Sequence, residues 1–359
     1  MFKSDVNSAT PRLAALDTLR GVAVMLVLGA HLPAPQGDTC IVLLIRAWQR
    51  IGWIGVDLFF VLSGYLVSGL LFRSWKEHGR LNAARFLMRR AWKIYPAFFA
   101  MLGLVLLYLH VRGLATAQDL VLAEALFVQN YFPPIFPHTW SLAVEEHFYL
   151  LLPLLLVALR GSEARPFARL PAVCLLVAIL CLSLRIWTAS NPATPIWKIY
   201  QPTHLRVDAL LFGVVLAWCH HFHGPALAVF AQQRRKPLLL GAAIFAAPPF
   251  IWALGTQSEI ATFGLTGLWL AAGILLIVKL HSPAQRGFLA WIGTYSYSIY
   301  IWHFPARLVL IPMLLVPEQR GGWVELAAYF GLSLVCGLLS AWLVEMPCIR
   351  LRDRLFPRR

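Results

Sequence analysis

The sequence predicts an all-α membrane protein: a polytopic bundle of about ten transmembrane helices with both termini in the cytoplasm. Of its 359 residues, 59% are hydrophobic and only 13% are charged. The mean hydropathy is +0.69, which excludes a water-soluble domain of this length. Several segments reach the roughly 20 apolar residues that cross a hydrocarbon core of about 30 Å. The first contains Arg20 and has no small-residue cleavage site after it, so we expect a retained helix rather than a signal peptide.

Proline, glycine and charged residues divide the apolar sequence into ten predicted spans. The spans cover residues 14–33, 53–72, 94–112, 141–159, 170–188, 204–220, 238–254, 261–279, 290–312 and 323–345. The apolar run "DLVLAEALFVQN" between the third and fourth spans is predicted to be a re-entrant or interfacial helix. Residues 1–359 are therefore expected to form a single integral-membrane domain, with no soluble domain appended.

The loops on one side of these spans carry most of the 31 basic residues. The segment "RSWKEHGRLNAARFLMRRAWK" and the C-terminal "RLRDRLFPRR" both fall on the side of the N-terminus, which the positive-inside rule places in the cytoplasm. The same rule explains the net charge of +15 without a nucleic-acid partner. The opposite loops hold only Arg46, Arg50, Arg112, Lys198 and Arg320.

Ionisable residues inside the spans are predicted to meet in one chamber. Arg20 and His31 share a helix face, because eleven residues turn through nearly three full turns, about 1100°. His31 lies at the outer end of its span and Arg20 lies deeper. Charges in hydrocarbon must face one another or a wet cavity, so a polar chamber open toward the outer half is expected. The other spans contribute Asp57, Glu145, Glu146, Arg206, Asp208, Tyr297, Tyr300 and His303.

A second basic group begins the third span. In "RFLMRRAWKIYP", Arg85, Arg89 and Lys93 recur at helical spacing on one face, next to Arg90. One interpretation is an ordinary cytoplasmic loop on anionic lipid. The other is a phosphate site, because several guanidinium groups on one face can bind phosphates bidentately.

Several polar residues are expected to be structural. Arg185 and Arg307 are predicted to snorkel or to form ion pairs, and Glu345 to pair with the arginines of the C-terminal tail. Ser63, next to Gly64, is predicted to allow close helix packing. The six cysteines fit buried apolar positions. The "HHFHG" run has no nearby cysteine or carboxylate, so no metal site is predicted.

Seven blocks, in order, resemble the integral-membrane acyltransferase-3 family, which includes bacterial O-acetyltransferases of surface polysaccharides. The blocks are "LDTLRGVAVMLVLGAH", "GVDLFFVLSGYL", "RRAWKIYP", "HTWSLAVEEHFYLLLP", "RVDALLFG", "YSYSIYIWHFP" and "VEMP". The resemblance implies an acyl-CoA donor and acyl transfer to an acceptor on the far side of the membrane. The sequence shows no match to the extracellular hydrolase-like domain that some family members carry. We therefore expect this chain to finish the transfer itself or to pass the acyl group to another protein.

The family's motifs map onto particular residues of this chain. Its Arg and His separated by ten residues fall on Arg20 and His31, its basic motif on Arg89, Arg90 and Lys93, and its Trp-Ser-Leu-(x)2-Glu-Glu block on Trp140, Ser141, Leu142, Glu145 and Glu146. Two positions depart from the pattern. Lys93 replaces the usual arginine, which keeps the charge and loses the planar fork. His147 replaces a frequent glutamine and adds a titratable group.

These residues suggest a mechanism for acylating a sugar hydroxyl. His31 is expected to act as the general base, oriented by a carboxylate, either Glu145 or Asp57. Arg20, with the basic motif, is expected to hold acyl-CoA, by default acetyl-CoA. A covalent acyl-enzyme on Ser63, Ser141 or His31 stays open. The acceptor side is expected to include Trp140, Ser141, Glu146, Arg206, Asp208, Tyr297 and His303, and "FPHTW" at the chamber mouth for a sugar ring.

The expected partners are a carbohydrate acceptor, membrane lipids and envelope-glycan assembly proteins, in the inner (cytoplasmic) membrane of a bacterium. The acceptor could be O-antigen, exopolysaccharide, peptidoglycan or a small hydroxylated metabolite. Two other classes are compatible with polar groups in a membrane. One is a transporter or flippase for a lipid-linked saccharide or small anion, although no inverted repeat is visible in the sequence. The other is a non-catalytic partner in an envelope assembly complex.

Overall fold

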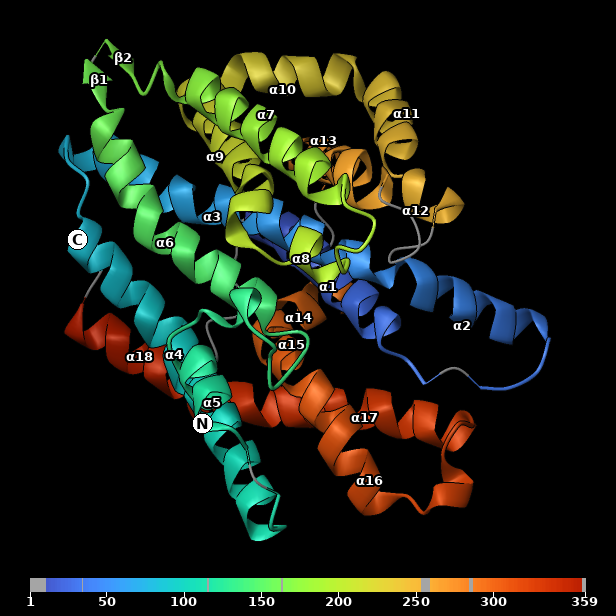
Figure 1. Cartoon of the computed structure of the whole chain (residues 1–359). Coiled ribbons are helices and arrows are strands. Elements are labelled where there is room, and N and C mark those ends of the chain that lie inside the picture. Colours follow the sequence, from blue (N-terminus) through green and yellow to red (C-terminus); the bar gives the residue numbers. More distant parts are fainter. Residues whose placement is uncertain are drawn as a thin grey trace.

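A computed structural model describes residues 11–33, 35–114, 116–162, 164–252, 259–283 and 287–356. This part of the chain is almost entirely helical (Figure 1). Its two strands, β1 (Gly161–Ser162) and β2 (Arg165–Pro166), are two residues each and pair as an antiparallel hairpin. The predicted all-α class is therefore confirmed.

The helices of the first half run from the N-terminus to the hairpin. They are α1 (Pro11–Ala30), α2 (Cys40–Ile51), α3 (Gly55–His78), α4 (Ala83–Val111), α5 (Gln118–Ala125) and α6 (Trp140–Ala158), with short 3-10 turns at Gly52–Ile54 and Gln129–Tyr131.

The second half of the chain consists of helices separated by short turns. They are α7 (Leu170–Ala189), α8 (Trp197–Tyr200), α9 (Val207–Phe222), α10 (Gly224–Gln233), α11 (Arg235–Phe245), α12 (Pro248–Ile251), α13 (Leu265–Leu280), α14 (Phe288–Thr294), α15 (Ser296–Pro305), α16 (Ile311–Leu314), α17 (Trp323–Ser340) and α18 (Met346–Leu355). Turns of 3-10 helix lie at Thr203–Leu205 and Pro317–Gln319, and π-helical turns at Ile260–Gly264, Ala306–Leu310 and Ala341–Glu345.

The described helices include several that can cross a membrane. Six continuous helical stretches have the required length and hydropathy: Cys40–His78, Ala83–Val111, Trp140–Ala158, Leu170–Ala189, Ile260–Leu280 and Trp323–Leu355. The bent pair α9 and α10, at 108°, would add a seventh. The multi-pass architecture is confirmed, whereas the count of ten spans and the cytoplasmic termini stay predictions. The last two residues of the predicted span 238–254 lie outside the described residues.

The third predicted span began too late. The helix α4 starts at Ala83 rather than residue 94, because the Asn82 side chain caps it by accepting from the Arg85 backbone N–H at 3.0 Å. The whole basic segment "RFLMRRAWK" is therefore helical and continuous with the span. The preceding helix α3 ends at Gly79, whose φ of +66° suits glycine.

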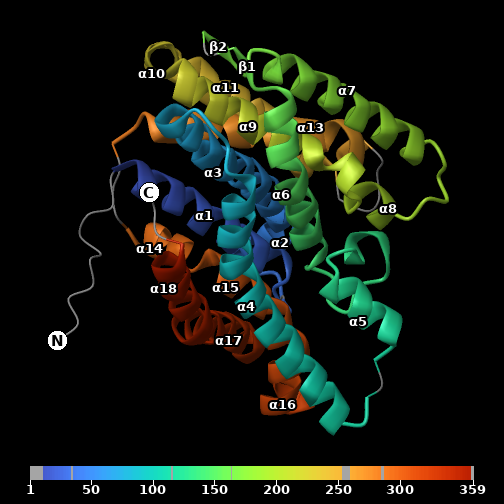
Figure 2. The same cartoon turned by 90° about the vertical axis from the view of Figure 1, so that its left-hand side faces the viewer.

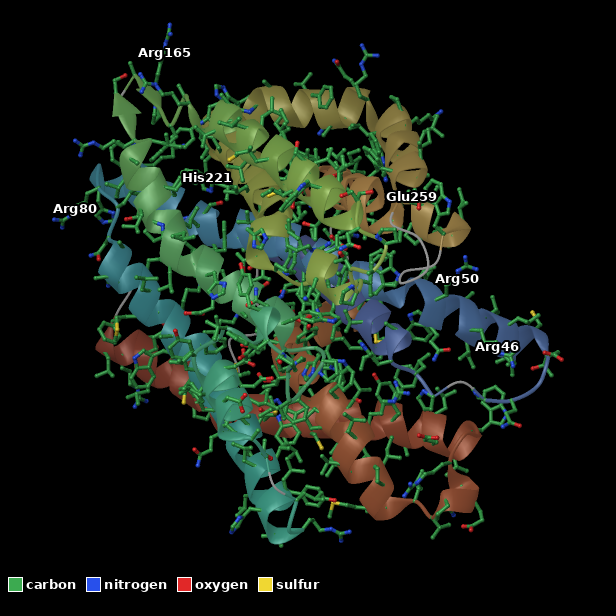
Figure 3. All side chains as sticks on the ribbon, viewed as in Figure 1. Arg46, Arg50, Arg80, Arg165, His221 and Glu259 are labelled. Carbon is green, nitrogen blue, oxygen red and sulfur yellow. The ribbon has the colours of Figure 1, made fainter. Side chains whose placement is uncertain are left out.

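The helix α2 was missed by the sequence analysis. Its sequence, "CIVLLIRAWQRI", is amphipathic, and it begins where the Thr39 hydroxyl accepts from the Val42 backbone N–H. It runs through a 3-10 turn into α3 and extends that helix outward, as Figure 1 shows at the right. Arg46 and Arg50, on α2, lie at the opposite end of the molecule from Arg80 and Arg165 (Figure 3). This separation matches the two groups of loops that the charge pattern predicts.

Small residues bring the central helices together. A Cβ built on Gly64 of α3 would lie 2.0 Å from the Leu210 carbonyl oxygen of α9, which confirms the predicted close packing beside Ser63. A Cβ on Gly21 of α1 would lie 1.9 Å from the Leu289 carbonyl oxygen of α14. The contact at Gly21 fixes the depth of α1 in the bundle. It therefore also fixes the positions of Arg20 and His31. In Figure 2, α4 runs down the front of the bundle, with α17 and α18 on one side and α5 and α6 on the other.

Candidate active site

A cavity of about 860 Å³, here called the basic cavity, opens where the end of α3, the start of α4 and α18 meet. Its lining has one carboxylate, Glu77, against seven cationic side chains, which is the composition of a site for a multiply charged anion. The cationic residues are Arg73, Arg80, Arg85, Arg89, Arg90, Lys93 and Arg352.

A second cavity of about 360 Å³, here called the inner cavity, adjoins the basic cavity. The two share Leu70, Arg90 and Lys93 in their linings. The inner cavity is half apolar, with aromatic and aliphatic walls and a few polar groups, as expected for a site that holds an elongated, partly polar chain. Its polar lining comprises Arg20, Ser63, Glu145, Tyr149, Ser141, Ser296, Tyr297 and Tyr300.

The basic motif lies at the junction of the two cavities, as the phosphate-site interpretation requires. Arg90 sits over the Tyr149 ring at 5.5 Å, and Lys93 lines both cavities. Arg20 reaches the inner cavity from α1, and its guanidinium lies 3.7 Å from the Asp17 carboxylate. The four residues expected to hold the donor therefore line two adjoining cavities: Arg89 lines the basic cavity, Arg20 the inner cavity, and Arg90 and Lys93 both.

The C-terminal helix completes the basic cavity in a way that the sequence did not indicate. Asp353 of α18 accepts from Arg89 at 2.7 Å and from Arg352 at 2.8 Å, and Arg89 also donates to the Phe356 carbonyl oxygen at 2.6 Å. Arg352 is buried and lines the cavity. From the sequence, the tail arginines were predicted to mark the cytoplasmic side and to pair with Glu345, because nothing in a basic tail shows which helix it will pack against.

The residues of "WSLAVEEH" point to different neighbours, because successive helical residues are about 100° apart. Glu145 lines the inner cavity and accepts from the Tyr149 hydroxyl at 2.8 Å, while Tyr149 shares a 2.6 Å hydrogen bond with Ser63. Glu146 accepts from Tyr95 and ties α6 to α4, so the structure gives it a structural contact in place of the predicted acceptor-binding position. His147 hydrogen-bonds Thr203 at 2.7 Å.

Ser141 closes the inner end of the cavity. Its hydroxyl shares a 2.6 Å hydrogen bond with Tyr300, which in turn donates to the His138 carbonyl oxygen at 2.7 Å. Tyr297, one turn below, also lines the cavity, and its hydroxyl donates to the Ile94 carbonyl oxygen at 2.7 Å. Ser141 and Tyr297 thus line the same cavity, and their predicted place on the acceptor side stays a prediction.

Three imidazoles meet just beyond Tyr300. Nδ1 of His31 lies 3.3 Å from Nε2 of His303, and the His138 and His303 ring centroids are 4.7 Å apart. Burial lowers the pKa of His138 to about 3, so its ring is neutral. His138 was predicted only as part of a contact surface for a sugar ring. In the structure, His138 is buried in this cluster.

Among the described residues, neither of the two carboxylates expected to orient the His31 ring contacts it. Asp57 is buried and paired with Arg206 at 2.8 Å, and Glu145 faces the inner cavity. Asp57 therefore does not contact His31 here, because the buried Arg206, at the start of the neighbouring helix α9, pairs with its carboxylate. Nδ1 of His31 instead faces the Val27 carbonyl oxygen at 3.0 Å, and Arg307 donates to the His31 carbonyl oxygen at 2.6 Å.

The predicted acceptor residues Arg206 and Asp208 form two buried ion pairs. Arg206 pairs with Asp57, and Asp208 pairs with Arg185 at 2.8 Å and accepts from Trp269 at 3.1 Å. The guanidinium of Arg206 is enclosed by the rings of Tyr200, Phe60 and Trp140, at 4.7, 5.5 and 5.7 Å. The burial gives Arg206, Asp208 and Trp140 structural contacts, and their acceptor-binding role stays a prediction. Arg185 is an ion-pairing residue, one of its two predicted alternatives.

Other polar residues hold the helices in place. Glu345 accepts from Ser298 at 2.7 Å, and no ion pair with a tail arginine is present among the described residues, so that prediction is wrong. Cys174 and Cys181 are buried as predicted, whereas Cys40 is exposed. Within the described ranges, no three His, Cys, Asp or Glu side chains are grouped to hold a metal ion.

A helical bundle with several membrane-spanning helices and a cation-lined cavity beside an inner, partly apolar one has features expected of an integral-membrane protein that binds an anionic substrate. The chain belongs to the acyltransferase-3 family, whose acyltransferase domain matches residues 13–342. Six of the seven sequence blocks lie within this match, and "VEMP" follows just after its end.

Curated relatives narrow the comparison. The chain is 30% identical to the peptidoglycan O-acetyltransferase OatA of Listeria monocytogenes, with 93% of this chain and 55% of the relative covered. It is 28% identical to the putative peptidoglycan O-acetyltransferase YrhL of Bacillus subtilis, with 97% and 56% covered. It is 26% identical to a putative O-acetyltransferase of Staphylococcus aureus, with 93% and 57% covered. The chain thus spans about half the length of these relatives. No solved structure matches it.

Proposed function

We propose that this protein is a membrane O-acyltransferase that moves an acetyl group from acetyl-CoA to a hydroxyl of a cell-envelope glycan, at the cytoplasmic membrane of a bacterium. The observation that carries the proposal is the pair of adjoining cavities, the basic cavity and the inner cavity, the second of which is lined by Ser141 and Tyr300 beside the histidine cluster. The names of the relatives support acetyl as the group and make peptidoglycan the first acceptor to test.

The two cavities fit the two parts of acyl-CoA. Its phosphates need several fixed cations, and the basic cavity has seven against Glu77. Its pantetheine arm is slender and partly apolar, as is the inner cavity that begins at Arg90 and Lys93. Bound this way, the thioester would lie near Ser141 and Tyr300, with the nucleotide still at the basic end.

The chemistry then needs a base at the far end of the path. His31 accepts the proton of the acceptor hydroxyl while the hydroxyl oxygen forms a bond to the acyl carbon. Collapse of the tetrahedral intermediate breaks the carbon–sulfur bond, and the CoA thiolate takes the proton from His31. The hydroxyls of Ser141 and Tyr300, which hydrogen-bond each other and the His138 carbonyl oxygen, would have to turn toward the oxyanion to stabilise it.

The test is transfer of radiolabel from acetyl-CoA to peptidoglycan fragments by the purified protein in nanodiscs. Labelled glycan that depends on both donor and protein supports the proposal. A flippase would move lipid-linked saccharide without any donor, and a non-catalytic partner would do neither. Label retained on neither peptidoglycan nor other envelope glycans would contradict the assignment.

The donor site makes a specific prediction about Arg352. We expect Arg352→Gln to raise the KM for acetyl-CoA about tenfold and to leave kcat nearly unchanged, because a charge-assisted hydrogen bond to phosphate contributes about 1.5–3 kcal/mol. Arg350→Gln is the matched control, since Arg350 is on the same helix and exposed, outside the cavity lining. Equal KM values for the two variants would remove α18 from the donor site.

A further inference from the structure

We propose that His303 is a positioning residue that holds His31 in its Nδ1–H tautomer, so that Nε2 of His31 carries the lone pair that removes the acceptor's proton. The inference deepens the proposed function and rests on it. It replaces the predicted role of His303 in binding the acceptor.

His303 lies too deep to touch an acceptor. Its side chain is fully buried, at 0% exposure, on α15 between Tyr300 and Phe304. His31, by contrast, is only half-buried at the end of α1. Of these two imidazoles, His31 is therefore the one that a substrate can reach, and His303 acts through it.

The hydrogen bonds of the pair determine where each proton sits. Nδ1 of His303 contacts the Tyr300 carbonyl oxygen, and a carbonyl oxygen only accepts, so this nitrogen carries the hydrogen. In the neutral ring, Nε2 of His303 then has a lone pair, and it faces Nδ1 of His31. Nδ1 of His31 also faces the Val27 carbonyl oxygen, which likewise accepts.

Both neighbours of His31 Nδ1 are therefore acceptors, and this nitrogen must be the donor. One N–H is shared between the Val27 carbonyl oxygen at 3.0 Å and Nε2 of His303 at 3.3 Å. The lone pair of His31 is left on Nε2, which has no hydrogen-bond partner among the described residues. The tautomer of a catalytic imidazole is set by the hydrogen bond that its other nitrogen makes.

The arrangement also prepares His31 to become charged. When Nε2 takes the hydroxyl proton, the imidazolium keeps its Nδ1–H directed at two acceptors, which offsets part of the cost of a new charge near the Arg307 guanidinium. A buried carboxylate plays this part in hydrolytic triads. Here a neutral imidazole and a backbone carbonyl do so, which fits a cluster in which neither Asp57 nor Glu145 contacts His31.

Two substitutions of His303 separate this role from packing. We expect His303→Leu to lower kcat about 100-fold, with the KM for acetyl-CoA unchanged within twofold. His303→Gln, whose side-chain oxygen can accept in place of Nε2, should stay within about tenfold of the parent kcat. His204→Leu is the control, because His204 is exposed and outside the cluster. Equal losses in the Leu and Gln variants at unchanged melting temperature would overturn the proposal.

The tautomer can be read without any turnover. Nitrogen-15 NMR of histidine-labelled protein, with His31 assigned by difference from His31→Gln, should show the hydrogen on Nδ1 in the parent protein and a mixture of tautomers in His303→Leu. Hydrogen on Nε2 in the parent would overturn the inference. Because this readout needs no acyl transfer, it also decides the matter if the proposed function fails or if a variant does not fold.

Discussion

Replacement of His31 by alanine is expected to lower the rate of acyl transfer by about 10²–10⁴-fold, the contribution of a positioned general base. The reason is that no other imidazole of the cluster can take its place, since His138 and His303 are both buried. Donor binding should persist, because the basic cavity lies at the other end of the path. The measurement is kcat with labelled acetyl-CoA, together with calorimetric binding of CoA.

His110→Ala is the control for this experiment, because His110 is an exposed histidine near the end of α4. It should keep the parent rate. If His31→Ala kept more than a tenth of the parent rate, another group would be the base, and the histidine cluster would have no catalytic role.

Replacement of Arg206 by methionine is expected to destabilise the protein by about 3–5 kcal/mol, the usual cost of leaving a buried charge without its partner. The partner is Asp57, which is 1% exposed and receives the 2.8 Å hydrogen bond of Arg206. Thermal unfolding in detergent, followed by circular dichroism, would show the loss as a lower melting temperature.

The double replacement of Arg206 by methionine and Asp57 by leucine should recover most of this loss, because neither charge then remains buried alone. The matched control is Arg46→Met, which breaks an exposed 3.3 Å pair with Asp38 and should barely move the melting temperature. A single Arg206→Met variant as stable as this control would show that the buried pair does not hold α3 to α9.

Hydropathy predicted the helical architecture well. A segment that crosses hydrocarbon must make its backbone hydrogen bonds within a helix, and it is therefore visible in the sequence as a long apolar run. It predicted less about α2 and the early start of α4. Both segments are amphipathic or basic, and their ends are decided by the caps Thr39 and Asn82 rather than by hydrophobicity.

The site residues were predicted where one helix face determines them. Arg20, Glu145, Lys93 and Ser141 do lie around one cavity, since ionisable and polar groups in a membrane helix face the interior of the bundle. The ion-pair partners of these charged residues could not be predicted from helix faces. Asp57 and Arg206 are 149 positions apart, and only the packing of α3 against α9 decides that they pair with each other.

The same limit explains what was missed. Arg352 belongs to the basic cavity only because α18 folds back along α4, and His138 belongs to the histidine cluster only because the segment before α6 packs on α15. A sequence pattern shows the type of residue and its local geometry. It does not show the long-range neighbour that gives a polar side chain its role.

The central claim is that the acyl donor binds at one end of the path and the glycan acceptor at the other. Acyl transfer across the membrane of a vesicle tests this claim most directly. Proteoliposomes would carry the protein in one orientation, with peptidoglycan fragments enclosed and labelled acetyl-CoA added only outside, at the exposed basic end. The account predicts acetylated glycan inside and free CoA outside, with neither when the basic end faces the lumen. Acetylated glycan formed only when donor and glycan are on the same side would contradict it.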